Sequence, residues 1–193
     1  SSSLCAIKNG VSHGASHGLT PQGGVPQNNR IGDLDPFALA LVMQADGLSF
    51  DEVLEQCGSR SGLLGLCGFN DMRDIEVRAA AGDERCALAM ETYTSSIRDY
   101  LGSYVVELGG LDVISFTGGI GEHSVAVREQ VLNDLEFLGV EVDDALNRTV
   151  RGEGRLHTNT SRVRVYVLRA DEELIVARQS FEFLGGDSLP SIG

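Results

Sequence analysis

The chain has 193 residues, of which 42% are hydrophobic and 22% charged, and its formal net charge is -13. This length suffices for one domain with a substantial core, and no apolar run approaches the roughly 20 residues that a transmembrane helix needs. The acidic balance argues against nucleic acid as a partner, because a phosphate backbone needs a basic surface, but a nucleotide would need only a local positive pocket. Residues 4–7 are too short for the apolar core of a signal peptide.

The basic residues and the cysteines narrow the class of protein further. Lys8 is the only lysine among the 15 basic residues, and all the others are arginines. A phosphate or carboxylate clamp would therefore use the planar arginine fork, which binds two oxygens at once, although composition bias accounts for most of these arginines. The four cysteines form no C-x-x-C pair, and their spacing predicts reduced, buried thiols in a cytoplasmic protein rather than disulfides.

The N-terminal segment predicts a β-hairpin. Residues 4–7 are apolar, Asn9-Gly10 is a hairpin turn signal, and residues 11–16 can return as the second strand. A domain rarely begins with an apolar strand this close to its first residue, so we expect a preceding partner segment to be absent from this chain. His13 and His17 lie in a glycine-rich stretch, which favours a loop or strand without metal over a metal-binding helix.

A long loop is expected over residues 18–32, where glycine, proline and asparagine occupy eight positions. Loops of this length inside a compact domain are usually either functional or disordered. Arg30 favours the functional interpretation, because it lies at the end of the loop, just before the sequence I-G-D-L-D-P.

Residues 35–108 are predicted to be mainly helical. A helix over 35–44 begins with Asp-Pro, and a helix over 49–58 begins with the capping box S-F-D-E. Residues 61–69 form an apolar, glycine-rich connector, and a short helix follows over 71–80. The long helix 83–108 carries a stripe in steps of three and four, which predicts a core or subunit interface rather than a cofactor site. The stripe consists of Ala87, Met90, Thr94, Ile97, Leu101, Tyr104 and Leu108.

The C-terminal part alternates strands with helices. Strand 111–117 leads through a glycine-rich turn into a helix over 124–137. Strand 162–168 alternates as R-V-R-V-Y-V-L and precedes a last helix, 172–183, capped by Asp171. This alternation predicts an α/β fold with a largely parallel sheet.

Residues 115–124, S-F-T-G-G-I-G-E-H-S, form the first candidate site. A strand, a glycine turn and a helix start direct backbone N–H groups at one point, which favours an anion such as phosphate. Gly119 and Gly121 would let a ligand approach the backbone closely. The segment fits neither the Walker A loop nor the dinucleotide fingerprint, because no Lys follows and position 124 is Ser. A tight turn that only packs the helix onto the strand is the alternative interpretation.

Six motifs, taken in order, connect most of the chain to one family. They are S-L-C-A-I-K-N-G, G-L-T-P-Q-G-G-V-P-Q-N-N-R-I-G-D-L-D-P, S-G-L-L-G-L-C-G-F-N-D-M-R-D, F-T-G-G-I-G-E-H-S-x-x-V-R, F-L-G-V-E-V-D and D-E-E-L-I-V-A-R. Their order and spacing, over about residues 3–180, closely resemble the acetate kinase family, which includes acetate, propionate and butyrate kinases. The resemblance covers only the C-terminal half of such an enzyme. It implies a C-terminal domain over 1–184, without the N-terminal domain and its H-L-G-N-G phosphate loop, and a flexible tail over 185–193.

The resemblance implies a sugar kinase/actin-like ATPase (ribonuclease H-like) fold, which is an α/β domain with a mixed sheet flanked by helices. It also implies reversible transfer of the γ-phosphoryl group of ATP to a short carboxylate, giving an acyl phosphate and ADP, with Mg²⁺ as cofactor. The implied partners are ATP or ADP, a short-chain carboxylate and a second copy of the chain in a homodimer, with no nucleic acid and no membrane. Phosphoryl transfer depends mainly on positioning and charge neutralisation, which suits the residue types of the motifs.

The matched motifs also imply individual roles. Arg30 matches the family's active-site arginine and would hold the carboxylate or the transferring phosphoryl group; alternatively, it pairs with Asp33 or Asp35 to brace the next helix. Glu172 matches the family's Mg²⁺-ligand carboxylate, although by itself it would be an ordinary glutamate in a first helical turn. The implied nucleotide-binding residues are Asp71, Met72, Arg73, Gly119, Ile120, Gly121, Glu122 and His123.

Departures from the family pattern leave the function open. The family usually has V-D-T-S-M-G-x-T-P where this chain has H-G-A-S-H-G-L-T-P, so Gly14 replaces an aspartate that the resemblance implies assists catalysis and metal binding. Either His13 or His17 compensates, or the activity is weak or altered. Asn29 and His123 also depart from the pattern. The hypotheses are, in order, an acetate kinase-type phosphotransferase, a non-catalytic actin-like nucleotide-binding module, and a kinase for propionate or butyrate. As one half of such an enzyme, this chain alone is expected to be inactive.

Overall fold

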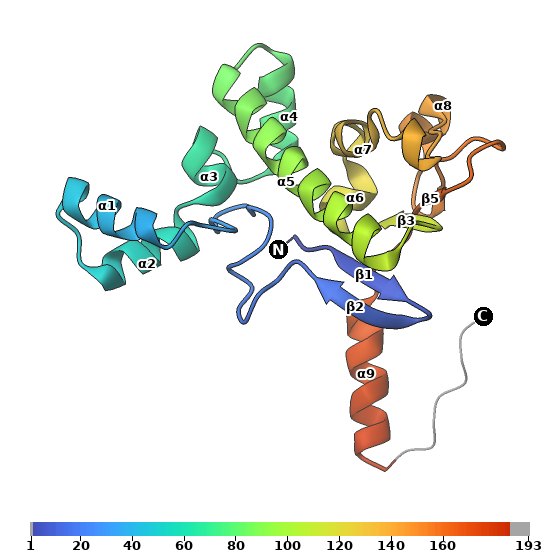
Figure 1. Ribbon diagram of the computed structural model, residues 1–193, viewed down its shortest axis with the longest axis horizontal. Helices are drawn as coiled ribbons and strands as arrows, with labels where there is room; N and C mark the ends of the chain where they lie inside the picture. The colour runs from blue at the N-terminus through green and yellow to red at the C-terminus, as the bar shows by residue number, and fades with distance from the viewer. Residues whose placement is uncertain (1, 186–193) are drawn as a thin grey trace.

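The computed structural model describes residues 2–185 and shows helices packed around a small sheet, with a separate hairpin near the N-terminus (Figure 1). The hairpin pairs β1 (Cys5–Lys8) with β2 (Val11–Ala15) in an antiparallel arrangement. Asn9 and Gly10 form its turn in the left-handed region, at φ 53° and 78°, which an Asn-Gly pair adopts readily. The predicted hairpin is therefore confirmed. Of the predicted flexible tail 185–193, only residue 185 is among the described residues.

Three helices, α1 (Phe37–Asp46), α2 (Phe50–Ser59) and α3 (Gly62–Cys67), follow the long loop. α2 begins with the predicted capping box, in which Ser49 and Glu52 bind each other's backbone N–H groups. α3 occupies the segment predicted as a connector. Figure 1 shows α1 and α2 as an arm that projects from the body of the domain. None of the ten residues of α1, all of them described, is buried.

The predicted helices over 71–80 and 83–108 are present as α4 (Met72–Ala80) and α5 (Glu84–Leu108), each capped at its N-terminus by an aspartate. The buried residues of α5 are Cys86, Ala89, Met90, Tyr93, Thr94 and Tyr104. The predicted stripe is therefore only partly right, since Ala87 is exposed and the buried face is rotated relative to it. α5 packs against α3, α4 and α7, so this face belongs to the core of the chain.

The small sheet has the strand order β3-β5-β4. β3 (Val113–Phe116) pairs in parallel with β5 (Arg164–Val167), whereas β4 (Gly154–Arg155) pairs antiparallel with β5. The expected α/β fold with a mixed sheet flanked by helices is confirmed, but the expectation of a largely parallel sheet holds only for β3 and β5. The sequence pattern predicts neither β4 nor α8 (Asp144–Thr149), because both are too short to show a hydrophobic period.

The predicted helix 124–137 is interrupted. α6 (Gly118–His123) takes up the glycine-rich turn itself, and α7 (Val125–Leu132) follows it. α7 ends because Asn133 is extended and Asp134 adopts a left-handed φ of 55°, which Asp tolerates better than most residues. The predicted turn therefore becomes a short helix, and the predicted long helix is a shorter one.

The last helix agrees with the prediction. α9 (Glu172–Phe183) begins after Asp171, whose carboxylate accepts a hydrogen bond from the backbone N–H of Leu174. Figure 1 shows α9 projecting from the body of the domain. Across residues 2–185, no helix combines the length and the apolar character that crossing a bilayer requires.

Two clusters of buried side chains form the core. The first lies among α3, α4, α5 and α7, and the second surrounds β3 and β5 and is partly covered by the short 3-10 helix Glu136–Leu138. Phe116, at the carboxyl end of β3, packs against both clusters, so the glycine-rich segment begins where the two clusters meet. Cys67 and Cys86 are buried, as predicted for reduced thiols, whereas Cys5 is exposed.

Candidate functional site

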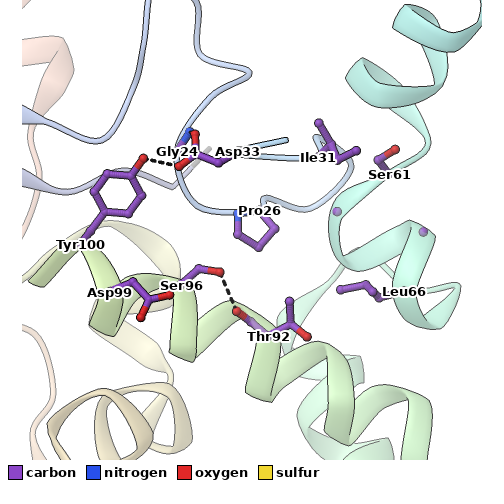
Figure 2. A pocket seen from close by; sticks show the side chains of 12 residues that line it. Gly24, Pro26, Ile31, Asp33, Ser61, Leu66, Thr92, Ser96, Asp99 and Tyr100 are labelled. Carbon is purple, nitrogen blue, oxygen red and sulfur yellow. Dashed lines mark hydrogen bonds between the residues drawn. The ribbon is translucent and has the colours of Figure 1, made fainter. Parts of the chain in front are cut away.

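Residues 16–36 form the loop that carries Arg30, here named the Arg30 loop. Two hydrogen bonds of 2.8 Å join its arms, one from Gly24 N to Asp33 Oδ1 and one from Asp33 N to Gly24 O. The Tyr100 hydroxyl of α5 donates to Asp33 Oδ2 at 2.5 Å (Figure 2). Glycine is required at position 24, because φ is +93° and a Cβ would lie 2.6 Å from a carbonyl oxygen of the same loop. These contacts argue against a disordered loop.

Backbone carbonyl groups at the tip of the Arg30 loop accept hydrogen bonds from the N-terminus of α3. The N–H of Leu63 donates to Gln27 O at 2.8 Å, and the N–H of Leu64 donates to Asn28 O at 2.9 Å, so N–H groups that a helix leaves unpaired find partners. Gly62 has a φ of +59°, and a Cβ there would lie 2.1 Å from Gln27 O. This long-range contact explains why α3 forms from a glycine-rich sequence with low helix propensity.

The Arg30 side chain is half-buried, and its Nη1 donates a long hydrogen bond of 3.5 Å to Gln27 Oε1. Gln27 is buried and is itself fixed by donating to Pro21 O at 2.7 Å. Among the described side chains, which do not include that of Glu172, the ion pairs join Arg60 to Glu55, Arg73 to Asp71 and Arg148 to Glu129. Bracing of the next helix by Arg30 would need an ion pair with Asp33 or Asp35, and neither is among them. The guanidinium therefore keeps donors for an anionic ligand.

The second predicted segment is the N-terminus of α4. Asp71 caps α4 and accepts hydrogen bonds from the Arg73 side chain on both carboxylate oxygens, at 2.9 Å from Nε and 2.5 Å from Nη2. These side-chain hydrogen bonds lower the pKa of Asp71 to about 2. Met72 is buried in the first core cluster. Of the three predicted residues, Asp71 and Arg73 therefore present side chains at the surface, whereas Met72 contributes packing.

Glu122 binds backbone groups on two sides. Its Oε1 accepts a hydrogen bond from the N–H of Gly118 at 3.0 Å and another from the N–H of Ala170 at 3.3 Å. The first contact supplies a partner for the N-terminus of α6, and the second connects α6 to the segment that precedes α9. The structure therefore shows Glu122 as a link between two predicted site segments.

Of the other residues of α6, some pack against the core and some are exposed to solvent. A Cβ on Gly121 would contact Phe116 at 3.4 Å, and Ile120 packs against the first core cluster. A Cβ on Gly119 would meet nothing within 4 Å, and both Gly119 and His123 are exposed. The packing interpretation therefore describes Gly121 and Ile120, while Gly119 and His123 are accessible to a ligand.

Arg128 of α7 supports the end of α6. Its side chain is 1% exposed, and Nη1 donates to the carbonyl oxygens of Gly121 and Glu122, both at 2.9 Å. Nε donates to Asn147 Oδ1 at 2.7 Å, and Nη2 donates to Asn147 O at 2.9 Å. The motif S-x-x-V-R contains this arginine, but sequence reasoning assigns it no role, because nothing in the pattern shows that the side chain turns inward.

Hydrogen bonds connect the predicted site segments into one series. Asn28 Nδ2 of the Arg30 loop donates to Asn70 O at 2.6 Å, next to the N-terminus of α4. The Ser124 hydroxyl, just after α6, donates to Glu76 Oε1 on α4. Glu122 adds the link from α6 to the start of α9. The structure therefore brings together segments that are far apart in the sequence, through Asn28, Glu76 and Ser124, which sequence reasoning did not single out.

The predicted metal ligand Glu172 is the first residue of α9, and its side chain lies outside the described part of the chain. Within that part, no group of three or more His, Cys, Asp or Glu side chains is placed to hold a metal ion. In phosphotransferases, Mg²⁺ is bound mainly by phosphate oxygens and one or two carboxylates. A carboxylate at position 172 has the donor chemistry for that role.

Position 14 does not face the predicted site. Gly14 lies in β2, and a Cβ there would point at α5, 3.2 Å from both Tyr104 Cε1 and Glu107 Oε2. An aspartate here would meet a tyrosine ring and a like charge, so the structure gives no support to the expectation that a catalytic carboxylate is lost at this position. His13 lies in β2 and His17 in the following loop, in agreement with the predicted strand or loop.

A cavity of about 530 Å³ lies between the Arg30 loop, α3 and α5 (Figure 2). Its lining includes Pro26 and Ile31 of the loop, Leu66 of α3, and Ser96 and Tyr100 of α5. Of the predicted site residues that the structure describes, none lines this cavity. The cavity therefore shares the Arg30 loop with the predicted site segments but contains none of the predicted site residues that the structure describes.

Comparison with known proteins agrees with the motif order. The chain matches the model of the "Acetokinase family" over residues 1–178. It is 43% identical over 178 residues to propionate kinase of Yersinia enterocolitica, covering 92% of this chain and 43% of that protein. It is 41% identical over 179 residues to acetate kinase of Shouchella clausii, covering 92% and 45%. The crystal structure of Porphyromonas gingivalis acetate kinase matches with a TM-score of 0.89 at 40% identity, covering 94% and 46%.

The chain spans about half the length of the curated relatives it matches. The matched range 1–178 contains every predicted site residue, from Arg30 to Glu172. The similarity to a solved acetate kinase confirms the expected actin-like ATPase fold. The motifs, the fold and the family match all agree, and the chain belongs to the acetokinase family.

Proposed function

We propose that the chain is a domain of a carboxylate kinase that transfers the γ-phosphoryl group of ATP to acetate, giving acetyl phosphate and ADP in a reversible reaction. Membership of the acetokinase family supports this reaction class. The observation that carries the proposal is the environment of Arg30. Its half-buried guanidinium lies on a loop fixed to α5 through Asp33 and Tyr100, and it has no carboxylate partner among the described side chains, which do not include that of Glu172.

In this reaction Arg30 would hold the carboxylate of the acceptor or the transferring phosphoryl group. A fixed positive charge that contacts two oxygens stabilises the negative charge of the phosphoryl oxygens in the transition state. The exposed backbone at Gly119, together with Asp71 and Arg73, would bind the nucleotide. Glu172 would be a carboxylate ligand of Mg²⁺, which when bound neutralises charge on the nucleotide phosphates.

Propionate is the second candidate acceptor. The chain is 43% identical to a propionate kinase and 41% identical to an acetate kinase, so sequence identity does not select between the two acids. One methylene group in an apolar pocket changes specificity by only about 10–200-fold, which a few side chains can provide. We place acetate first, because both the Shouchella relative and the Porphyromonas structure are acetate kinases.

We also propose that catalysis needs the full-length enzyme, since the matched relatives are about twice as long as this chain. Their additional half would supply the other wall of the cleft and a phosphate-binding loop. This chain alone would bind nucleotide weakly and catalyse little or no transfer. The full-length protein would act in the cytoplasm as a homodimer.

The alternative of a non-catalytic nucleotide-binding module depended on the glycine at position 14. A side chain at this position would point toward α5, which weakens the support for that alternative.

Kinase assays on the full-length form with acetate, propionate and butyrate, in the presence of Mg·ATP, test the proposal. We expect the highest kcat/KM with acetate, and a higher value with propionate would select the second candidate. If the protein binds ADP but forms no acyl phosphate from any of the three acids, the non-catalytic module would be the better description. Acyl phosphate formation by this chain alone at about 1–1,000 s⁻¹, the usual range for enzymes, would contradict the need for the other half.

A further inference from the structure

Ser124 lies between α6 and α7 and connects both helices to α4. Its backbone N–H donates to Ile120 O at 2.8 Å, which closes α6, and its hydroxyl oxygen accepts from Val127 N at 3.0 Å, which caps α7. The same hydroxyl donates its proton to Glu76 Oε1 on α4. Ser124 is only 5% exposed. This hydrogen bond to a carboxylate is therefore partly shielded from water, where such bonds are stronger than at the surface.

Arg128 lies one helical turn beyond Ser124, and its charged side chain is buried behind the end of α6. The acceptors of its hydrogen bonds are carbonyl oxygens and the side-chain amide of Asn147, all of them uncharged. Burial lowers the pKa of Arg128, and the carboxylates of Glu129 and Glu76 act against this lowering. Glu76 thus contributes a hydrogen-bond acceptor behind α6.

We propose that Glu76 is a positioning residue of the nucleotide site. Through its hydrogen bond with Ser124, it holds α6, with the exposed Gly119, in a fixed place relative to α4. Glu76 lies three residues after Arg73, within one turn of the same helix, so its anchoring also fixes the N-terminal segment of α4. The inference rests on the proposed function, in which these two segments bind one nucleotide.

The reason to expect an effect on binding is preorganisation. A ligand that contacts two segments binds best when their spacing is already correct. Ordering the segments during binding costs free energy and so weakens the observed affinity. Loss of the Glu76 hydrogen bond would loosen α6 against α4 without removing any group that contacts the nucleotide. The expected result is weaker ADP binding by a chain that still folds.

Calorimetry with ADP on the 193-residue chain tests this role. Glu76→Ala removes both the acceptor and the charge, whereas Glu76→Gln keeps an oxygen acceptor and removes only the charge. We expect the Kd for ADP to rise about tenfold in Glu76→Ala, which corresponds to about 1.4 kcal/mol, and less than about threefold in Glu76→Gln. The matched control is Glu91→Gln, which neutralises an exposed carboxylate on α5 and should bind ADP like wild type.

Two further measurements separate positioning from general stability. Adding Ser124→Ala to Glu76→Ala should weaken binding little further, because both changes remove the same hydrogen bond. Hydrogen exchange at the amides of residues 118–123 should be faster in Glu76→Ala than in Glu76→Gln, at temperatures where both are folded. If Glu76→Ala does not fold, Ser124→Ala takes its place, with the same tenfold rise in Kd expected.

A wild-type Kd in folded Glu76→Ala or Ser124→Ala would overturn the positioning role. Equal losses in the Ala and Gln variants of Glu76 would also overturn it, because the charge alone would then account for the effect. A wild-type chain that binds no ADP would instead overturn the proposed function, and this inference with it, so the two failures are distinguishable.

Discussion

The Tyr100 hydroxyl on α5 donates a 2.5 Å hydrogen bond to Asp33, which also accepts a hydrogen bond from the backbone N–H of Gly24 across the Arg30 loop. The Asp33 carboxylate therefore links the two arms of the Arg30 loop to each other and to α5. This arrangement explains how a loop rich in glycine and proline can hold Arg30 in one place.

The Tyr100–Asp33 hydrogen bond should be visible in the pH dependence of stability. This hydrogen bond, with a smaller effect of burial, raises the pKa of Tyr100 to about 12 from a usual value of 10.0. A pKa raised in the folded state stabilises the fold fully below the unfolded-state pKa of 10.0, and that contribution disappears as the pH rises from there to about 12. Thermal unfolding across this range should show a larger loss of stability in wild type than in Tyr100→Phe. Equal losses would show that the hydrogen bond does not form in solution.

Gly62→Ala should strongly destabilise the chain. Its φ of +59° is unfavourable for alanine, and the Cβ would lie 2.1 Å from Gln27 O, so both the N-terminus of α3 and the tip of the Arg30 loop must move. We expect a loss of about 2 kcal/mol or more in urea unfolding. Gly102→Ala is the matched control, since Gly102 lies on the exposed side of α5 with nothing near its Cβ position; it should be stabilising by about 0.5–1 kcal/mol. A Gly62→Ala chain as stable as wild type would refute this description of α3.

Two glycines of α6 should respond differently to a larger side chain. Gly119→Val adds a side chain where the structure has open space, so it should lower ADP affinity about tenfold or more, by obstructing the ligand, with little loss of stability. Gly121→Val adds a side chain against Phe116, where a Cβ alone already lies at 3.4 Å, so it should lower the melting temperature. Calorimetry with ADP and thermal unfolding on the same samples provide the check. If both variants bind ADP like wild type, the segment has only a structural role.

Arg128→Met should destabilise the chain by about 3 kcal/mol or more, because it leaves the buried acceptors of Gly121, Glu122 and Asn147 without donors. Arg128→Lys keeps the charge but not the planar fork, so its loss should be intermediate. The control is Arg60→Met, since Arg60 forms only a surface ion pair with Glu55; it should change stability by less than about 0.5 kcal/mol. Urea unfolding of the three variants measures these differences, and similar values for all three would contradict the bracing role of Arg128.

The elements that the sequence predicts well are those with local signals. The Asn9-Gly10 turn, the capping box of Ser49 and Glu52, and the aspartate caps of α4, α5 and α9 depend on neighbouring residues only. α3 could not be predicted in this way, because its first N–H groups are paired by carbonyl oxygens of the Arg30 loop, more than 30 residues earlier. The split of 124–137 likewise depends on the left-handed Asp134, which no periodicity shows.

The sequence predicts the candidate site as a set of segments rather than as individual side chains. Matching the family motifs selects Arg30, α4, α6 and the start of α9, but it does not distinguish side chains that face a ligand from side chains that hold the backbone. Met72 is a core residue, and Glu122 binds backbone N–H groups. The side chains that join the segments, Glu76 and Arg128, make contacts set by the tertiary fold, so local sequence carries no signal for their roles.

Arg30 is the residue on which the proposed reaction depends most. In a full-length enzyme that contains this chain, Arg30→Ala should mainly lower kcat, by about 100-fold or more, because charge stabilisation acts most strongly in the transition state. Arg30→Lys restores the charge without the two-oxygen fork, so it should recover only part of the activity. Arg60→Ala removes an exposed arginine and serves as the control, with kcat close to wild type.

The most direct measurement determines kcat with acetate and Mg·ATP, together with the melting temperature, on the same preparations of wild type, Arg30→Ala, Arg30→Lys and Arg60→Ala. The proposed function predicts a large fall in kcat for Arg30→Ala, partial recovery for Arg30→Lys, and melting temperatures close to wild type. An unchanged kcat combined with a lowered melting temperature would contradict it, because Arg30 would then brace the helix that follows rather than act on the substrate.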